Sequence, residues 1–236
     1  MMIMYNTLMG VCAGLGLVLL ALLGKKLLKR ETIAPEGWSL AFGVIGVILT
    51  FLSGLMATTW PLTANPPLNI LFAEPSLMLG VMLIAASIFL AKQKDAINAL
   101  SSSNKKVADE TEVYLRRVLA PISWVVFGVG LMLLFSTLAI FRFTLVGSAP
   151  AMEPISGLLH DYPLVENTFF GILYGLPAIG ALLMPLAVRN PRSGLTKLVG
   201  YSWAIAGVAF VLFSALNYYT HSGMLYNILH GTNFTF

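Results

Sequence analysis

Long apolar segments recur along the whole chain and set the first expectation about its fold. Each segment offers the ~20 mostly apolar residues that a helix needs to cross a bilayer. No segment alternates polar and apolar residues over about ten positions, as the strands of a membrane barrel do. The pattern predicts an all-α integral membrane helical bundle, a single transmembrane domain over 1–236, with six spans at approximately 5–24, 38–59, 68–92, 119–142, 167–188 and 197–219.

The basic residues between these segments predict the orientation of the bundle. Thirteen of the fourteen Lys and Arg residues fall in the first, third and fifth loops or at their edges, and Arg142 alone lies on the opposite side. Because cytoplasmic loops are enriched in basic residues, these three loops are expected in the cytoplasm and both termini outside. Residues 93–117 then form a cytoplasmic loop, 108–119 a helical extension of the fourth span, 143–166 an outer loop and 222–236 an interfacial tail on the outer side.

Composition excludes several classes of protein. Of the 236 residues, 58% are hydrophobic and 10% are charged, whereas a soluble domain carries about 25% charged residues. The net charge of +4 comes from the clustered loops and not from a basic stripe with interleaved aromatic residues, so nucleic acid is not an expected partner. The single cysteine, Cys12, allows neither an intrachain disulfide nor an iron–sulfur site.

Glu74 is the one carboxylate within a predicted span, and Pro75 follows it. A charge at that depth is a candidate functional group, which here would handle a proton, a cation or a quinone head group. We favour a structural interpretation. Proline suits the first turn of a helix, so the spanning helix is expected to begin at Pro75, with residues 68–73 along the interface. Glu74 would then cap the positive end of the helix dipole.

Three further candidates stand at predicted helix starts. Glu36 lies at the cytoplasmic start of the second span and is interpreted as a first-turn acid, with contact to a partner subunit as the alternative. Glu166 and Asn167 lie at the outer start of the fifth span and are interpreted as an acid and a cap.

Imidazole and carboxylate groups on the outer side are the candidate metal ligands, because both bind several divalent ions. They are His160, Asp161 and Glu153 in the outer loop and His221 at a helix end. No HxxxH or HxxE spacing links any two of them on one helix, so we expect mostly solvated or interfacial groups and no confident metal site. None of the histidines, His230 included, lies inside a span, so an embedded bis-histidine haem is not expected.

Small residues spaced four apart predict close helix packing. Gly10 and Gly14 form one such pair, and Gly171 and Gly175 form another. Such pairs let two helix backbones approach closely. The neighbouring helix is expected in the same chain, and a neighbouring subunit is the alternative.

Three short motifs resemble those of a known family. They are EGWSLAFG at 36–43, EPS at 74–76 and ENTFFG at 166–171. Together they resemble an uncharacterised family of prokaryotic polytopic membrane proteins, a domain of unknown function, from about residue 6 to residue 213. The resemblance implies a prokaryotic cytoplasmic membrane and a fold of six or seven helices. It implies no activity, so it supplies no catalytic residues.

The functional prediction rests mostly on the catalytic and nucleotide-binding motifs that the sequence lacks. The sequence has no GxxxxGK[ST] fingerprint, no GxSxG elbow and no HExxH pair. We therefore expect a non-catalytic or accessory subunit of a membrane complex, energy-converting or respiratory in kind, with the bilayer and other membrane subunits as partners. A small transporter or channel is one alternative, and a quinone- or metal-dependent membrane enzyme is another. Bound lipid is expected, and a quinone is the cofactor left open.

Overall fold

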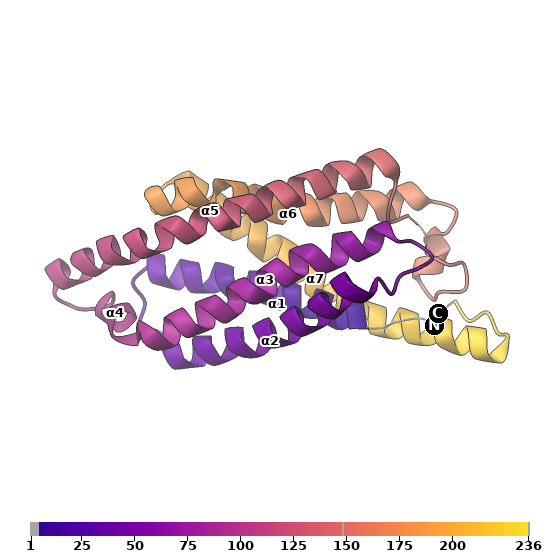
Figure 1. Cartoon of the computed structure of the whole chain (residues 1–236), viewed down its shortest axis with the longest axis horizontal. Helices are drawn as coiled ribbons and strands as arrows, with labels where there is room; N and C mark the ends of the chain where they lie inside the picture. Colours follow the sequence, from indigo (N-terminus) through magenta and orange to yellow (C-terminus); the bar gives the residue numbers. More distant parts are fainter. Residues whose placement is uncertain (1–4, 148, 236) are drawn as a thin grey trace.

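A computed structural model describes residues 5–147 and 149–235, and this part of the chain is helical without strands. The long helices lie roughly along one axis (Figure 1). The elements are α1 (Tyr5–Leu28), α2 (Pro35–Thr59), α3 (Pro67–Lys92), the short α4 (Lys94–Ala99), α5 (Lys105–Phe143), the 3₁₀ turn η1 (Ser156–Leu159), α6 (Pro163–Arg189) and α7 (Gly194–His230).

Six of these helices, α1, α2, α3, α5, α6 and α7, are long and apolar enough to cross a membrane. The predicted all-α bundle of six spans is therefore confirmed. The start of α1 and the end of α7 lie at the same end of the bundle (Figure 1). We call this the outer end, after the predicted orientation, and the opposite end the cytoplasmic end.

One predicted helix start is wrong, and another helix runs beyond its predicted span. α3 begins at Pro67 and runs through Pro75 without a break, so Pro75 is not its first residue. Pro66 and Pro67 already occupy the helix start, where a proline loses no hydrogen bond. α7 continues to His230, so most of the expected interfacial tail is helical.

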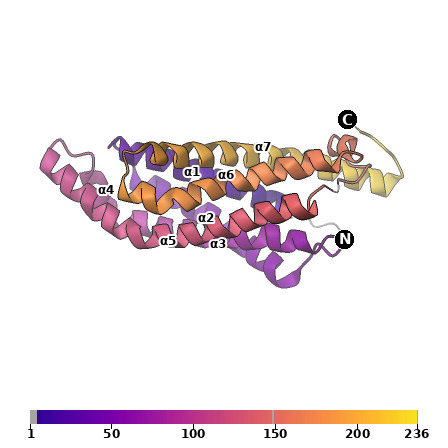
Figure 2. The ribbon, with the colours of Figure 1, turned by 90° about the horizontal axis from the view of Figure 1, so that it is seen from above.

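Two helices are much longer than a bilayer is thick. α5 has 39 residues and α7 has 37, which at 1.5 Å per residue gives about 58 and 55 Å, against a hydrocarbon core of about 30 Å. α5 therefore projects at the cytoplasmic end, as its predicted extension requires, and α7 projects at the outer end (Figure 2).

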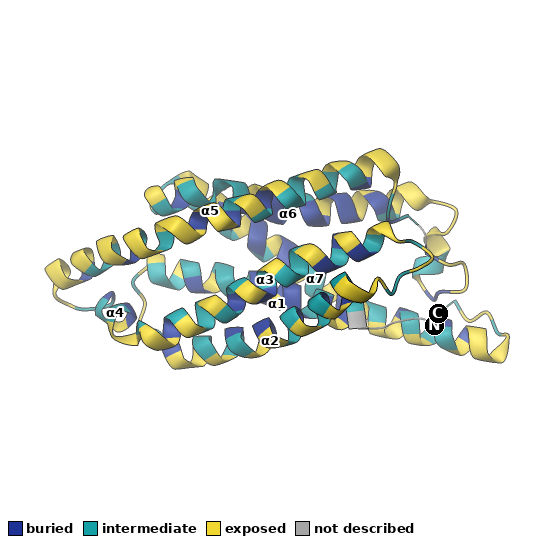
Figure 3. Ribbon diagram, viewed as in Figure 1, coloured by how far each residue is buried: buried dark blue, intermediate teal, exposed yellow. Residues whose placement is uncertain are grey.

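The six long helices form a ring. Neighbours pack in the order α3, α2, α1, α7, α6 and α5, and α5 then returns to α3 through few contacts. Exposed residues lie on the outward faces of the helices and many buried ones face the interior (Figure 3). We call the sparse α3–α5 junction the seam.

Glycines set the closest approaches between neighbours. Gly14 on α1 lies against Gly207 on α7, where a Cβ added to either would come within 2.6 or 2.7 Å of the other's carbonyl oxygen. Gly171 on α6 lies against the ring of Phe141 on α5. The two small-residue patterns therefore serve packing within the chain, as predicted, because only glycine leaves room for such contacts.

A charged network joins three cytoplasmic segments. Arg30, just after α1, binds Asp109 at 2.6 Å and Glu112 at 2.7 Å, and Arg192 between α6 and α7 binds Glu112 at 2.6 Å. The pKa of the Arg30 guanidinium is raised above its usual value by the hydrogen bonds to Glu112 and then to Asp109. It therefore stays charged at physiological pH and holds the predicted cytoplasmic loops against the projecting end of α5.

Candidate functional site

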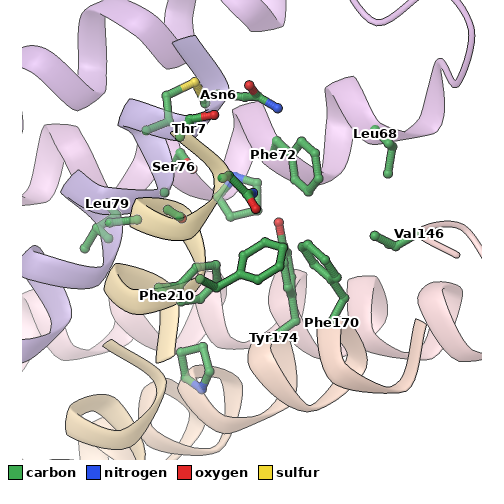
Figure 4. A pocket seen from close by; sticks show the side chains of 18 of the residues that line it. Asn6, Thr7, Leu68, Phe72, Ser76, Leu79, Val146, Phe170, Tyr174 and Phe210 are labelled. Atoms are coloured by element: carbon green, nitrogen blue, oxygen red, sulfur yellow. The ribbon is translucent and has the colours of Figure 1, made fainter. Parts of the chain in front are cut away.

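A cavity of about 360 Å³ lies inside the ring of helices and is the main candidate for a functional site. α1, α3, α5, α6 and α7 line it, together with the outer loop between α5 and α6. Around it, Phe72 projects from α3, Phe170 and Tyr174 from α6, and Phe210 from α7 (Figure 4). Its volume falls within the range of about 300–1,000 Å³ found for small-molecule sites. We call it the central cavity.

Polar side chains gather at the outer end of the central cavity. They come from the start of α1, the outer loop, the first turns of α6 and the outer half of α7: Asn6, Thr7, Glu153, Ser156, Glu166, Asn217 and His221. The lining deeper along the same bundle is mostly apolar and includes Leu17, Leu20, Met82, Val126 and Ala181. The central cavity is therefore amphipathic along its length.

Glu153 is the most buried acid of this polar end, with 6% of the residue exposed. Its Oε1 accepts a hydrogen bond from the Thr220 hydroxyl at 2.7 Å and lies 3.5 Å from Nε2 of His221. Nδ1 of His221 in turn lies 3.3 Å from the Thr7 hydroxyl. A neutral imidazole with its proton on Nε2 would point that proton at the carboxylate and accept from Thr7.

The turn that presents Glu153 is strained. Ile155 has φ 64° and ψ −63°, and the Ser156 N–H donates to the Pro154 carbonyl at 2.7 Å. These values define a γ-turn of the rare, strained type, whose central residue has positive φ. Here that central residue is β-branched, and such residues seldom adopt positive φ. Such strain costs roughly 1–3 kcal/mol and clusters at functional sites. The turn positions both Glu153 and Ser156 on the cavity wall.

Contacts with α7 hold this turn in place. Gly223 lies beneath Pro154, where an added Cβ would come within 2.5 Å of the proline ring. Farther along α7, the Asn227 amide donates to the Met152 carbonyl at 2.9 Å. The outward projection of α7 therefore holds the loop that lines the outer end of the cavity.

Asn6 leaves one acceptor unused at the polar end. Its Oδ1 is buried and has no hydrogen-bond partner within the described residues. A buried acceptor without a donor costs about 1–3 kcal/mol. A donor brought by a bound molecule would remove that cost.

The side chain of Tyr174 on α6 supplies a hydrogen bond that is missing within α3. Pro75 has no N–H, so the carbonyl of Leu71, four residues earlier, loses its helical partner. The Tyr174 hydroxyl donates to that carbonyl at 2.8 Å. Tyr174 is buried and also lines the central cavity. The hydroxyl of Tyr174 on α6 thus replaces the hydrogen bond that Pro75 removes from α3.

Aromatic rings lie next to the polar end. The ring of Phe170 is 6.1 Å from that of Phe72 and 5.1 Å from that of Phe213, measured between centroids. Tyr174 and Phe210 form a further pair at 6.1 Å. These rings join α3, α6 and α7 and form much of the wall between the polar groups and the apolar interior.

Glu74 does not cap a helix. It lies inside α3, beyond its first turn, because the helix begins at Pro67. Its side chain is exposed on the side of α3 that carries Ile70 and Met78, and it does not line the central cavity. The cap interpretation is therefore wrong, and a role for Glu74 in the cavity is not supported.

The other predicted site residues are placed as follows. Glu36 is exposed in the first turn of α2, as expected for a first-turn acid. Glu166 lies in the first turn of α6 and its Oε2 accepts from the Ala149 N–H at 3.2 Å. Asn167 does not cap α6, which begins at Pro163. It is buried, donates to the Ile140 carbonyl at 2.9 Å and accepts from the Val146 N–H at 3.3 Å, so it caps the end of α5 instead.

The candidate metal ligands do not assemble. Over residues 5–147 and 149–235, no three His, Cys, Asp or Glu side chains converge as a metal site. Nδ1 of His160 lies 2.8 Å from the Ala149 carbonyl oxygen, and Asp161 is exposed. Glu153 and His221 do meet, but His221 lies within α7 and not at its end.

Sequence reasoning missed three features of the site. Glu153 and His221 belong to segments far apart in the chain, and nothing in their spacing indicates that they touch. Asn6 stands in the first span without a motif. The Tyr174 contact had a usable signal, since a proline inside a span leaves a carbonyl that a hydroxyl on a neighbouring helix can satisfy.

Six long apolar helices around a ligand-sized cavity define a multi-pass α-helical membrane protein. The chain belongs to an uncharacterised family, since the family model described as "Protein of unknown function (DUF981)" matches residues 1–223. The resemblance to a family of unknown function is therefore confirmed. No curated protein and no solved structure matches the chain.

Proposed function

We propose that this protein binds one amphipathic, membrane-soluble molecule in the central cavity, with its head at Glu153 and its apolar body between the helices. The observation that carries the proposal is the separation of polar and apolar lining along the cavity. A water-filled transport path would need polar groups along its whole length. A void left by loose packing would need no buried acid and no strained turn at one end.

This proposal favours the alternatives that use the outer carboxylates and histidines over a purely structural accessory role. Lipid, which is expected from the sequence, and quinone, which the sequence leaves open, both have the required amphipathic shape. An accessory role in a larger complex stays a prediction. The exposed apolar residues of α2, such as Leu40, Val47 and Phe51, suit lipid and a partner subunit equally. We place the protein in a prokaryotic cytoplasmic membrane with both termini outside.

A variant that fills the cavity tests this function. Val129 on α5 lines the cavity, and Leu131 on the same helix is exposed and does not line it. Val129→Trp should therefore exclude the ligand, and Leu131→Trp is the matched control. Native mass spectrometry of the full chain, extracted in a mild detergent, would count bound small molecules.

One molecule per chain is expected in the unmodified protein and in Leu131→Trp, and none in Val129→Trp. Equal occupancy in all three proteins would show that the bound molecules sit elsewhere and would overturn the proposal.

A further inference from the structure

The charges at the polar end restrict the head group of the ligand. Glu153 and Glu166 both line this end, and among the described residues no Lys or Arg lines any part of the cavity. The cation predicted on the outer side, Arg142, is exposed, and its guanidinium carbon lies 5.9 Å from the ring centroid of Phe143. An anionic head beside the buried Glu153 carboxylate would meet a like charge.

Burial strengthens this preference. Glu153 is almost wholly removed from solvent, where the lower local dielectric makes charge–charge interactions stronger than in water. A charge so buried is stable only when paired and hydrogen-bonded. Thr220 and His221 supply contacts, but a hydroxyl adds no charge, and an imidazole between a carboxylate and a hydroxyl is satisfied in its neutral form.

The neighbouring groups also suit a cation. The faces of aromatic rings attract ammonium groups within about 6 Å, and the rings of Phe72, Phe170 and Phe213 line the same cavity as the acids. The Oδ1 of Asn6, which has no partner among residues 5–147 and 149–235, is an acceptor on the same lining. An ammonium group donates hydrogen bonds and accepts none, so it complements both acceptors and rings.

We propose that the ligand of the central cavity is an amphipathic organic cation, an apolar body that carries one ammonium group. The proposal rests on the proposed function, because it names the head group for the same site. Alcohols of the same shape bind more weakly, since they donate a hydrogen bond without a charge. Carboxylates and phosphates are excluded by the like charge of Glu153.

Three probes with the same chain separate the head groups: dodecylamine, dodecanol and dodecanoate. The full chain would be embedded in lipid nanodiscs of fixed composition, and each probe titrated while the unfolding midpoint is followed by tryptophan fluorescence. A ligand that binds the folded state alone raises that midpoint. The Val129→Trp protein, whose cavity is filled, corrects for effects of each probe on the membrane.

Dodecylamine should bind most tightly, dodecanol about tenfold more weakly, because charge-assisted hydrogen bonds are about twice as strong as neutral ones, and dodecanoate not at all. Glu153→Gln should reduce the affinity for dodecylamine about tenfold and leave that for dodecanol nearly unchanged. Glu110→Gln, an exposed acid at the cytoplasmic end, is the matched control.

The outcomes separate the two proposals. If dodecanol or dodecanoate binds as well as dodecylamine, the cavity binds ligands but the preference for a cation is wrong. If none of the three binds above the Val129→Trp level, the proposed function itself is overturned. The ranking on the unmodified chain decides the matter even if Glu153→Gln fails to fold.

Discussion

Replacing Tyr174 by Phe removes one hydroxyl and tests how α3 tolerates a proline. The change would leave the Leu71 carbonyl without a donor, because Pro75 cannot supply the helical N–H. An unsatisfied buried carbonyl costs about 1–3 kcal/mol, whereas hydrogen bonds inside membrane proteins average about 0.6 and reach about 1.7 kcal/mol. From these two bounds, Tyr174→Phe should reduce the free energy of unfolding by about 1–2 kcal/mol.

A second substitution separates this mechanism from a general loss of packing. Pro75→Ala restores an N–H at position 75, which can donate to the Leu71 carbonyl as in an ordinary helix. In that background the hydroxyl of Tyr174 is no longer needed, and Tyr174→Phe should cost less than about 0.5 kcal/mol. The two residues therefore form a double-mutant cycle with a positive coupling energy.

Reversible unfolding of the detergent-solubilised chain would supply the four free energies. Tyr201→Phe is the control, since Tyr201 lies on α7 with 67% of its surface exposed, and it should change stability by less than about 0.5 kcal/mol. Equal costs of Tyr174→Phe with and without Pro75 would refute the reasoning. The hydroxyl would then stabilise the protein for some reason other than the missing N–H.

Two further predictions concern orientation and the acid on α3. In a chain with Cys12 replaced, a cysteine introduced at Ser102 should react with an impermeant thiol reagent from the cytoplasmic side alone. A cysteine introduced at Leu158 should react from the outer side alone. The reverse labelling pattern would show that the predicted orientation is wrong. Glu74→Gln should leave dodecylamine binding unchanged and alter stability by less than about 1 kcal/mol, because Glu74 is exposed outside the cavity. A tenfold loss of binding in this variant, measured by the same midpoint shifts, would place Glu74 in the site after all.

The sequence predicted the features that depend on local composition. Apolar length alone identified the six spans, and the small residues around Gly14 and Gly171 predicted close contacts within the chain. Boundaries were harder, because the Pro66–Pro67 and Glu74–Pro75 segments both look like helix starts. In the structure α3 begins at Pro67, and Tyr174, a residue on another helix, donates to the Leu71 carbonyl that Pro75 leaves without its helical partner.

The candidate site was less predictable, for a physical reason. Glu153, His221 and Asn6 lie on three segments brought together by the order of helices in the ring, and no periodicity encodes that order. Asn167 was identified as a cap, but its distance in sequence from Ile140 concealed which helix it caps. The outward orientation of Glu74 was not predictable either. The sequence shows that an acid lies in a span, but it does not show which way the side chain faces.

The reciprocal contact of Gly14 and Gly207 bears on how a molecule reaches the cavity. Where two backbones touch, tilting one helix against the other would bring them into a clash, so we expect the α1–α7 junction to resist opening. The seam, where α3 and α5 make few contacts, is the junction of the ring that we expect to separate most easily. The Asn65 amide, 2.9 Å from the Leu145 carbonyl oxygen, and the Tyr174–Leu71 bond tie the two sides together near the outer end. We expect a molecule dissolved among the lipid tails to enter sideways through the seam once these two bonds break, and to reach Glu153 without entering water.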